Sequence, residues 1–330
     1  MVAFFLLLVI LIFVSCEEPN LESNTFTIMN WNVQALMDMN VDGNEFNDFS
    51  LDEYDEESYR RRIRKVCDVI DDINADVVIL EEIENSNVLK DMLDMYLSRK
   101  GYLYYGAIKE DDSAIAIGFI SKIKTEKIQT HYVDDCRDLL SLDYIFEGQQ
   151  IRVLACHARS QINGFEESEI YRLNLAKTIK RVVEENDELQ IICVGDFNED
   201  PSKNTSFQTA LYDIDKENSF IYRNKGSILV TSSPYNALND IFYSPQLDVS
   251  YHKDKKGTYV YENNWYNFDL ILLNNYFFDK VNLEFDGFYI YAPQKICTSS
   301  GIPYKWNQKS LCGISDHFPV YVTLSCGINE

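Results

Sequence analysis

The stretch "IICVGDFNEDP" (191–201) decides how the rest of the chain is interpreted. Its apolar residues run into Gly195, as expected for a buried strand, and the strand then ends on Asp196 and Asn198. Asp, Asn and Pro all favour turns, so a simple turn would explain this ending. The alternative is a pair of hard oxygen ligands or acid/base groups held at the edge of a sheet. A single strand end does not decide between the two interpretations.

Six apolar segments in which strands are expected carry polar residues at one end. They end on or begin with Asn32 (26–32), Glu82 (76–82), His157 (151–157), Asp196 with Asn198 (191–196), Asp269 (268–274), and Asp316 with His317 (318–324). Four segments end on the polar group and two begin with it. If those two run opposite to the other four, all six positions meet along one edge of the sheets. Each residue alone could be a turn residue or a hydrogen-bonded structural group, but the set includes two of the chain's four histidines.

This set of side chains suits the hydrolysis of a phosphate ester. Mg²⁺ prefers oxygen ligands, keeps several waters and often binds through one or two carboxylates plus substrate phosphate. Such an ion stabilises charge on the phosphoryl oxygens and on the leaving oxygen. A carboxylate can take the proton from attacking water, and an imidazole kept cationic by a neighbouring Asp can stabilise charge on the phosphate. The joint pattern therefore predicts a hard-metal site with acid/base groups beside it.

At these residues the sequence resembles the endonuclease/exonuclease/phosphatase superfamily, which has the deoxyribonuclease I-like fold. The similar motifs are "NWNV" (30–33), "LEEIEN" (80–85), "HARS" (157–160), "GDFNEDP" (195–201), "GTYVYENNWYNFDLILLN" (257–274) and "SDHFPV" (315–320). They occur in the family's order and span nearly the whole chain after its N-terminal segment. Two departures stand out: Glu81 replaces the usual Gln, and "KEDDSAIAIGFI" (109–120) lacks the R-G-x-D pattern of many bacterial secreted members.

The resemblance implies a fold and a metal site. The fold would be α/β (α+β), a four-layer sandwich of two packed mixed β-sheets flanked by helices. The metal would be Mg²⁺, with Mn²⁺ or Ca²⁺ as alternatives. Glu82 would be its main ligand, and Asn32 and Asp316 would complete the shell.

The resemblance also implies roles in catalysis. Asp196 would orient or deprotonate the attacking water, and Asn198 would hold the substrate phosphate. His317 would face the phosphate and pair with Asp269, while His157 would contact the phosphate from the other side.

Two arginines are candidates for contact with the substrate phosphate. Arg137, in "CRDLLSLDYIF" (136–146), lies where deoxyribonuclease-like members carry a phosphate-contacting arginine. Its alternative is a plain surface strand residue. Arg159, in the "HARS" segment, could touch phosphate too.

The apolar spacing predicts strands that alternate with helices in the first part of the chain. Helices are expected at 59–73, from about 86 to 99 and near 166–185. The arginine cluster of the first helix (60–64) is interpreted as its solvated face. No repeat and no linker rich in Pro or Gly divides the chain, so one catalytic domain is expected over 26–326.

The bulk properties restrict the kind of partner. The chain has 330 residues, of which 46% are apolar, and this is ample for a substantial core. Its net charge of −23 argues against binding nucleic acid by bulk attraction, because non-specific binding depends mainly on Lys and Arg. An acidic enzyme can still cut a polyanion if a divalent metal and a few local cations neutralise it.

The N-terminus predicts export. "MVAFFLLLVILIFVSC" (1–16) is shorter than the about 20 residues of a membrane span but has the size of a signal-peptide core. Its end resembles a bacterial lipoprotein signal, with Cys16 as the lipidated first residue and 17–25 as a tether. The expected location is the extracytoplasmic side of the cell envelope, anchored to the membrane by lipid. The alternative is an uncleaved anchor helix.

The other cysteines give weaker signals. Cys67, Cys156 and Cys193 lie in apolar patterns and are expected in the core. Cys297 and Cys312 flank a loop-like segment and could pair in an oxidising compartment, but their spacing alone does not establish a disulfide.

The predicted function is that of an exported, monomeric, metal-dependent endonuclease that cleaves DNA, with RNA as a further substrate. The runner-up is a sphingomyelinase-like or inositol-phosphate phosphoesterase. No membrane-inserting aromatic hairpin is evident, although 274–291 could hold one. A catalytically inactive surface binding protein is the alternative of a different class, and the complete set of catalytic positions argues against it.

Overall fold

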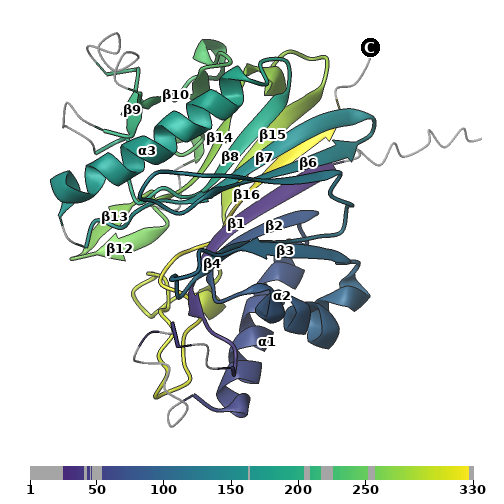
Figure 1. Ribbon diagram of the computed structural model, residues 1–330, viewed down its shortest axis with the longest axis vertical. Coiled ribbons are helices and arrows are strands. Elements are labelled where there is room, and N and C mark those ends of the chain that lie inside the picture. The colour runs from purple at the N-terminus through teal and green to yellow at the C-terminus, as the bar shows by residue number, and fades with distance from the viewer. Residues whose placement is uncertain are drawn as a thin grey trace, which may run out of the picture.

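Two β-sheets pack face to face at the centre of the structure, and helices cover their outer faces (Figure 1). The structure is a computed structural model that describes residues 25–40, 43–44, 46, 54–162, 164–203, 209–216, 226–251 and 257–326. Helices α1 (Glu56–Ile73) and α2 (Ser86–Met92) cover the first sheet, and α3 (Phe165–Glu184) covers the second (Figure 1). The expected four-layer sandwich of two mixed sheets is confirmed.

The first sheet has six strands in the order β15-β16-β1-β2-β4-β3. These strands are β1 (Thr25–Leu36), β2 (Val77–Ile83), β3 (Tyr104–Ile108), β4 (Ala116–Ser121), β15 (Leu283–Ile290) and β16 (Val320–Cys326). β1 runs parallel to β2 and antiparallel to β16. The sheet therefore joins the first and last strands of the described domain.

The second sheet has eight strands in the order β5-β6-β7-β8-β14-β11-β10-β9. They are β5 (Lys127–His131), β6 (Leu139–Phe146), β7 (Gln149–His157), β8 (Gln190–Asp196), β9 (Leu211–Asp213), β10 (Ile228–Thr231), β11 (Ile241–Tyr243) and β14 (Asp269–Leu273). A separate two-stranded hairpin consists of β12 (Tyr259–Tyr261) and β13 (Asn264–Tyr266). At the centre of the second sheet, β8 lies between β7 and β14.

The remaining helical segments are short. α2 continues as a π-helical turn (Leu93–Leu97) and a 3₁₀ turn (Ser98–Lys100), so the helix expected at 86–99 is confirmed as one irregular helix. Further 3₁₀ turns are Pro234–Asn236, Val249–Tyr251, Asn275–Phe277 and Gln294–Ile296. α1 begins where Asp55 accepts a hydrogen bond from the Ser58 amide (2.8 Å), and it ends at Asn74 in the left-handed conformation.

Strand alternation assigns the apolar residues to two layers of core. In β2, Val77 and Ile79 face the second sheet, whereas Val78 and Leu80 face α1 and α2. Because both faces of the strand are covered, its sequence is a continuous apolar run. The polar Glu81 and Glu82 that follow therefore stand out as exceptions at the end of a buried strand.

The arginine cluster of α1 is only partly solvated, which corrects one expectation. Arg60 and Arg61 are exposed and pair with acidic residues one turn earlier, but Arg62 is fully buried. Arg62 lies three residues after Tyr59 and four before Val66, so it shares the apolar face of the helix.

The structure decides two points that the sequence left open. The segment 274–291 forms a 3₁₀ turn and the edge strand β15 instead of an aromatic hairpin. Cys297 and Cys312 are both free thiols. Their backbones pair with different partners, Pro303 and Asn307, and no disulfide joins them. Cys67, Cys156 and Cys193 are buried in the core as expected.

The N-terminal predictions concern a part of the chain that the structure does not describe. The signal peptide 1–16, its Cys16 and the tether up to residue 24 lie outside the described residues. Among the residues that are described, none of the helices has the length and apolar character needed to span a membrane.

Candidate functional site

Strand register brings the polar strand ends of the second sheet together. Parallel pairing of β7 with β8 places His157 beside Asp196, and antiparallel pairing of β14 with β8 places Asp269 beside the same residue. β14 therefore runs opposite to the strands that end on the polar group, as predicted. β16 likewise runs antiparallel to β1, and Asp316 and His317 precede it at this end of the sandwich.

Asn32 connects the two sheets. Its Nδ2 donates hydrogen bonds to Glu82 Oε1 (3.0 Å) in the first sheet and to Asp196 Oδ2 (3.1 Å) in the second. Its Oδ1 accepts from the Gln34 amide (2.9 Å). In this arrangement Asn32 holds the two carboxylates at a fixed separation.

Glu82 lies at a bulge, where the backbone departs from regular strand geometry. Its φ is 61°, and the pairing of β2 with β4 shifts register at this residue. Its Oε2 accepts a hydrogen bond from the amide of Ala35 (2.9 Å). Gln34 and Ala35 also have positive φ, 56° and 49°, and lie in a bulge of β1. Bulges of this kind re-aim side chains next to active sites.

Arg62, in α1, holds the β1 bulge in place through hydrogen bonds to its carbonyl groups. Its guanidinium donates to the carbonyls of Ala35 (2.7 Å), Val33 (2.9 Å) and Gln34. Burial lowers the pKa of Arg62 to about 10, so it stays cationic at neutral pH. Sequence reasoning missed this residue, although its place on the apolar face of α1 was a readable signal.

Asp196 lies at the centre of the site. The preceding Gly195 has φ 153°, and a Cβ there would lie 2.0 Å from the carbonyl oxygen of Cys156, so only glycine fits. The carboxylate accepts a hydrogen bond from the amide of Asn198 (2.8 Å), whose side chain donates to the Ala158 carbonyl (3.1 Å). Burial raises the pKa of Asp196 to about 7, with His317 opposing the rise.

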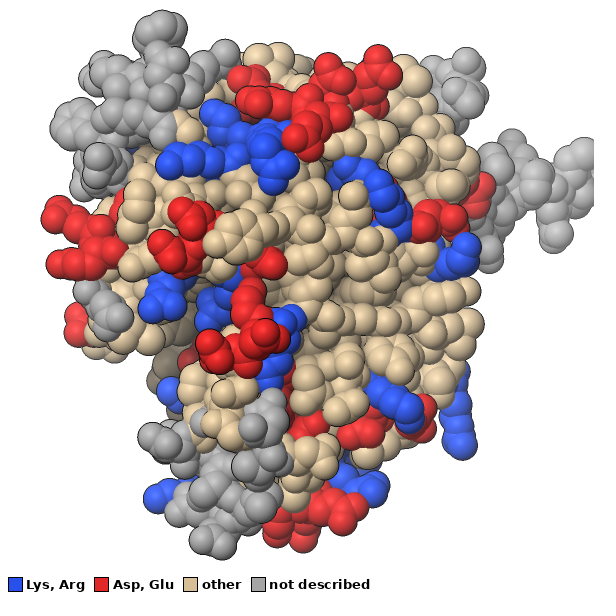
Figure 2. All heavy atoms as spheres, in the orientation of Figure 1, with Lys and Arg blue, Asp and Glu red and all other residues tan. Residues whose placement is uncertain are grey.

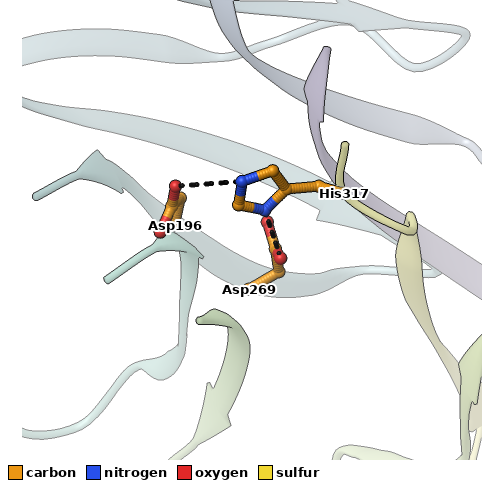
Figure 3. Close-up of side chains that lie close together, drawn as sticks. All are labelled: Asp196, Asp269 and His317. Carbon is orange, nitrogen blue, oxygen red and sulfur yellow. Dashed lines mark hydrogen bonds and ion pairs between the residues drawn. The ribbon is translucent and has the colours of Figure 1, made fainter. Parts of the chain in front are cut away.

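His317 and Asp269 form a buried pair (Figure 3). His317 Nδ1 lies 2.8 Å from Asp269 Oδ2, and its Nε2 lies 3.9 Å from Asp196 Oδ2. Burial alone would lower the pKa of His317, but Asp269 and then Asp196 outweigh it and raise the pKa well above its usual range. With a carboxylate facing each ring nitrogen, the ring is held as an imidazolium. Tyr259 stacks on its face, with centroids 4.6 Å apart.

His157 has the opposite electrostatic environment. Its Nε2 lies 3.9 Å from Glu82 Oε1 and 3.8 Å from Asp196 Oδ2, beyond hydrogen-bond length. Burial, with Arg137 and His317 adding to it, lowers its pKa well below the usual value, so the ring is neutral and the two contacts are not ion pairs. The site thus presents one cationic and one neutral imidazole.

Glu81 is a buried carboxylic acid beneath the site. It is fully buried, and neither side-chain oxygen has a hydrogen-bond partner among the described residues. Burial and the nearby Asp269 and Asp196 raise its pKa well above the usual range. A protonated carboxyl has a donor and an acceptor oxygen, and a glutamine amide likewise offers donors and an acceptor, so the raised pKa reduces the charge that the departure from the family's Gln adds here.

The remaining candidates lie at the margin of this group. Asp316 is half-buried, and its negative charge helps to raise the pKa of His317. Arg137 Nη1 lies 3.5 Å from the carbonyl oxygen of His157. Arg159 is exposed, and its guanidinium lies 5.6 Å from the centroid of the Tyr171 ring. Arg137 therefore contacts the backbone of a central residue, whereas Arg159 packs against Tyr171 of α3.

The donor set fits a hard divalent cation. Glu82 keeps 24% of its side chain exposed and Asp316 is half-buried, so each carboxylate is accessible to a hydrated ion. Ligand atoms of Asp196, Asp269 and His317 also lie within 4.8 Å of one another among the described residues. In this second cluster His317 Nδ1 is already hydrogen-bonded to Asp269 Oδ2, so neither atom is free to bind a metal ion. The cation therefore fits best on the Glu82 side.

The sequence matches a known family over nearly all of the described domain. A sequence model described as the Endonuclease/Exonuclease/phosphatase family matches residues 27–326. The chain therefore belongs to the endonuclease/exonuclease/phosphatase family, as its motifs predicted. It is accordingly a phosphoric ester hydrolase of a divalent-metal-dependent family. A comparison with curated proteins found no match.

Solved structures share the fold at low sequence identity. D. rerio TDP2 complexed with single strand DNA product is 16% identical, with a TM-score of 0.56 over 92% of this chain and 100% of that one. A family protein from Bacteroides thetaiotaomicron gives 14% and 0.57 over 94% and 98%. The human Nocturnin catalytic domain with bound sulfate gives 12% and 0.55 over 94% and 99%.

Proposed function

We propose that this protein is a Mg²⁺-dependent phosphodiesterase that cleaves nucleic acid, with DNA as the main substrate, by attack of water activated at Asp196. The observation that carries the proposal is the hydrogen-bonded bridge Glu82–Asn32–Asp196, which joins a metal-accessible carboxylate to a buried one. Both imidazoles face the same buried carboxylate, at 3.8 and 3.9 Å.

Each side chain has a task that its environment supports. Asp196 takes the proton from the attacking water, because its carboxylate is held by Asn32 and by the Asn198 amide and cannot rotate away. The His317 imidazolium, oriented by Asp269, stabilises the charge that develops on the phosphoryl oxygens. The neutral His157 donates a hydrogen bond to the phosphate without adding charge.

The metal site is proposed at Glu82, with Asn32 and Asp316 as further oxygen donors. A bound Mg²⁺ would neutralise the phosphate and stabilise the leaving oxygen. Asn32 supports this site by holding Glu82 Oε1, and the Ala35 amide holds Oε2.

Nucleic acid is favoured as substrate by the family and by one structural relative. D. rerio TDP2, which shares the fold, has been seen with a single-stranded DNA product. The face seen in Figure 2 carries acidic and basic side chains interspersed, without a continuous basic band. Binding would therefore depend on the metal and on local cations such as Arg137 more than on bulk charge.

We further propose that the protein is exported and anchored by lipid at Cys16. The support is the apolar N-terminal run that ends in Val-Ser-Cys (14–16) before a polar tether. Cys16→Ser should then block acylation, leaving precursor or releasing soluble protein. A mutant that still partitions fully into the detergent phase would indicate an uncleaved anchor helix instead.

An activity panel tests the proposed reaction. The purified protein is incubated with Mg²⁺ and with plasmid DNA, RNA, sphingomyelin or inositol phosphates, each with an EDTA control. Cleavage of DNA that EDTA abolishes is the expected result. Turnover of sphingomyelin or inositol phosphates without cleavage of nucleic acid would replace this proposal with the lipid or inositol alternative.

A further inference from the structure

The hairpin β12–β13 lies beside the site and is tied to it. The backbone of Tyr259 forms a β-bridge with His317, and the Phe318 amide donates to the Thr258 carbonyl (2.9 Å). The Tyr259 and His317 rings are stacked, with an interplanar angle of 29°. The hairpin therefore keeps a fixed position relative to the residue that faces the phosphate in the proposed function.

One face of this hairpin is aromatic. Tyr259 pairs with Tyr266 across the two strands, and both rings stack on Phe268, with centroids at 5.4 and 5.0 Å. Tyr261 is two residues beyond Tyr259, so strand alternation puts it on the same face. Its side chain is 56% exposed, and its ring has no stacking or hydrogen-bond partner within the described part of the chain. Tyr261 is thus the outermost ring of the row that begins at His317, and its face is accessible to a ligand.

The turn of the hairpin holds Tyr261 rigidly. Glu262 and Asn263 have φ of 48° and 63°, the two positive values of a type I′ turn, which matches the twist of the flanking strands. Tyr261 pairs with Asn264 immediately before and after this turn. Its backbone is thereby fixed at the last pair of the ladder, and only the two side-chain torsions of the tyrosine stay free.

We propose that Tyr261 is a stacking subsite for the base of a nucleotide next to the scissile phosphate. This inference rests on the proposed function, since it needs the phosphate at His317. Two residues of strand span about 7 Å, so Tyr261 lies one step outward from the Tyr259–His317 stack. A base reaches that position when its phosphate lies at the site. Stacking on an aromatic ring tolerates any base, as a nuclease of broad sequence range requires.

The chemistry of the hairpin tip favours a base over a lipid bilayer as the occupant. The turn consists of Glu262 and Asn263 and is followed by Asn264, and all three are exposed. Placing a carboxylate and two amides in hydrocarbon would be unfavourable, whereas they can stay hydrated while the flat face of Tyr261 contacts a base. The runner-up lipid phosphodiesterase would need an apolar tip.

The test uses two single-stranded oligothymidylates that differ only in the residues flanking the cut, which are normal in one and abasic in the other. Tyr261→Ala is expected to lower kcat/KM on the normal strand about 5- to 160-fold, mainly through KM, because base stacking contributes about 1–3 kcal/mol. The abasic strand should be cut by Tyr261→Ala and by the unaltered protein at similar rates. Tyr261→Phe should restore cleavage of the normal strand.

A matched control separates stacking from a general surface effect. Tyr235 is 96% exposed on a 3₁₀ turn of the second-sheet side, and Tyr235→Ala should change neither substrate. Equal loss on both strands, or no loss on either, would overturn the inference. A loss confined to binding of sphingomyelin vesicles would overturn it in favour of a lipid contact. If the unaltered protein cuts neither strand with Mg²⁺, the proposed function itself fails, and that outcome is distinguishable from the others.

Discussion

The two sheets hold their parts of the site in different ways. In the second sheet, His157, Asp196 and Asp269 occupy adjacent positions of regularly paired strands, so register alone brings them together. In the first sheet, Glu82 lies at a bulge with positive φ, and its partner Ala35 lies in a second bulge.

Because of this difference, the two halves of the site should respond differently to substitution. The register of β7, β8 and β14 is fixed by a continuous apolar core, and a single substitution at the strand ends leaves it intact. The two bulges are strained conformations that persist only because surrounding contacts maintain them. Arg62 and Asn32 supply such contacts, so the Glu82 side should respond to changes away from the reacting groups.

Among the acid/base groups, the largest expected loss follows removal of the His317 imidazolium, which pairs with Asp269 of the regular side. His317→Ala should lower kcat/KM on a phosphodiester by about 10²–10⁴-fold, because one acid/base group typically contributes that much. If His317 and Asp269 act as one unit, the double mutant should be scarcely worse than His317→Ala alone. A four-way cycle of kcat/KM measures this. Fully additive losses would show that Asp269 works separately from His317.

Asp269→Asn should shift the pH dependence as well. Burial lowers the pKa of His317 and Asp269 raises it, so loss of the carboxylate should let the ring lose its proton at a lower pH. If the imidazolium is the active form, the alkaline limb of the kcat/KM profile moves to lower pH in Asp269→Asn. An alkaline limb that stays in place would remove Asp269 as the group that keeps His317 protonated.

A smaller loss is expected from the support of the bulged side. Arg62→Met should lower Mg²⁺ affinity by about 10–100-fold, as is typical when a residue that orients a metal ligand is lost. Arg61→Met is the matched control, because Arg61 is one residue away, exposed and paired only with Glu57 among the contacts described. Calorimetric titration of both variants checks this. Equal, unchanged affinity would show that the β1 bulge holds without Arg62.

The smallest effect on activity is expected at Glu81, beneath the junction of the two sides. Its raised pKa means that the native state binds a proton that the unfolded chain releases, so stability should fall as pH rises above about 4.5. Glu81→Gln should keep activity and remove this fall, with a slope difference of up to about 1.4 kcal/mol per pH unit. Urea unfolding in EDTA across pH tests it, with Glu57→Gln as the exposed control. Parallel curves for Glu81→Gln and the unaltered protein would show that Glu81 ionises freely.

The sequence predicted the regular side of this comparison better than the bulged side. The place of Asp196, His157 and Asp269 in the site could be predicted, because each of them directly follows or precedes an apolar run. The bulges could not be predicted, because the residues with positive φ, Gln34 and Ala35, are not glycines. Arg62 was assigned to solvent because its neighbours are charged, and the hairpin β12–β13 was too short to show a period. In each of these cases tertiary contacts outweigh local preference.

In the proposed reaction Glu82 holds the metal on the bulged side, while Asp196 activates water on the regular side. Calorimetric titration of Mg²⁺ into the unaltered protein, Glu82→Gln and Asp269→Asn tests it most directly, with circular dichroism to verify the fold. Glu82→Gln should lose Mg²⁺ binding and hydrolysis together, whereas Asp269→Asn should keep Mg²⁺ binding and hydrolyse the substrate more slowly. Equal Mg²⁺ affinity in Glu82→Gln and the unaltered protein would contradict the assignment of Glu82 as the main ligand.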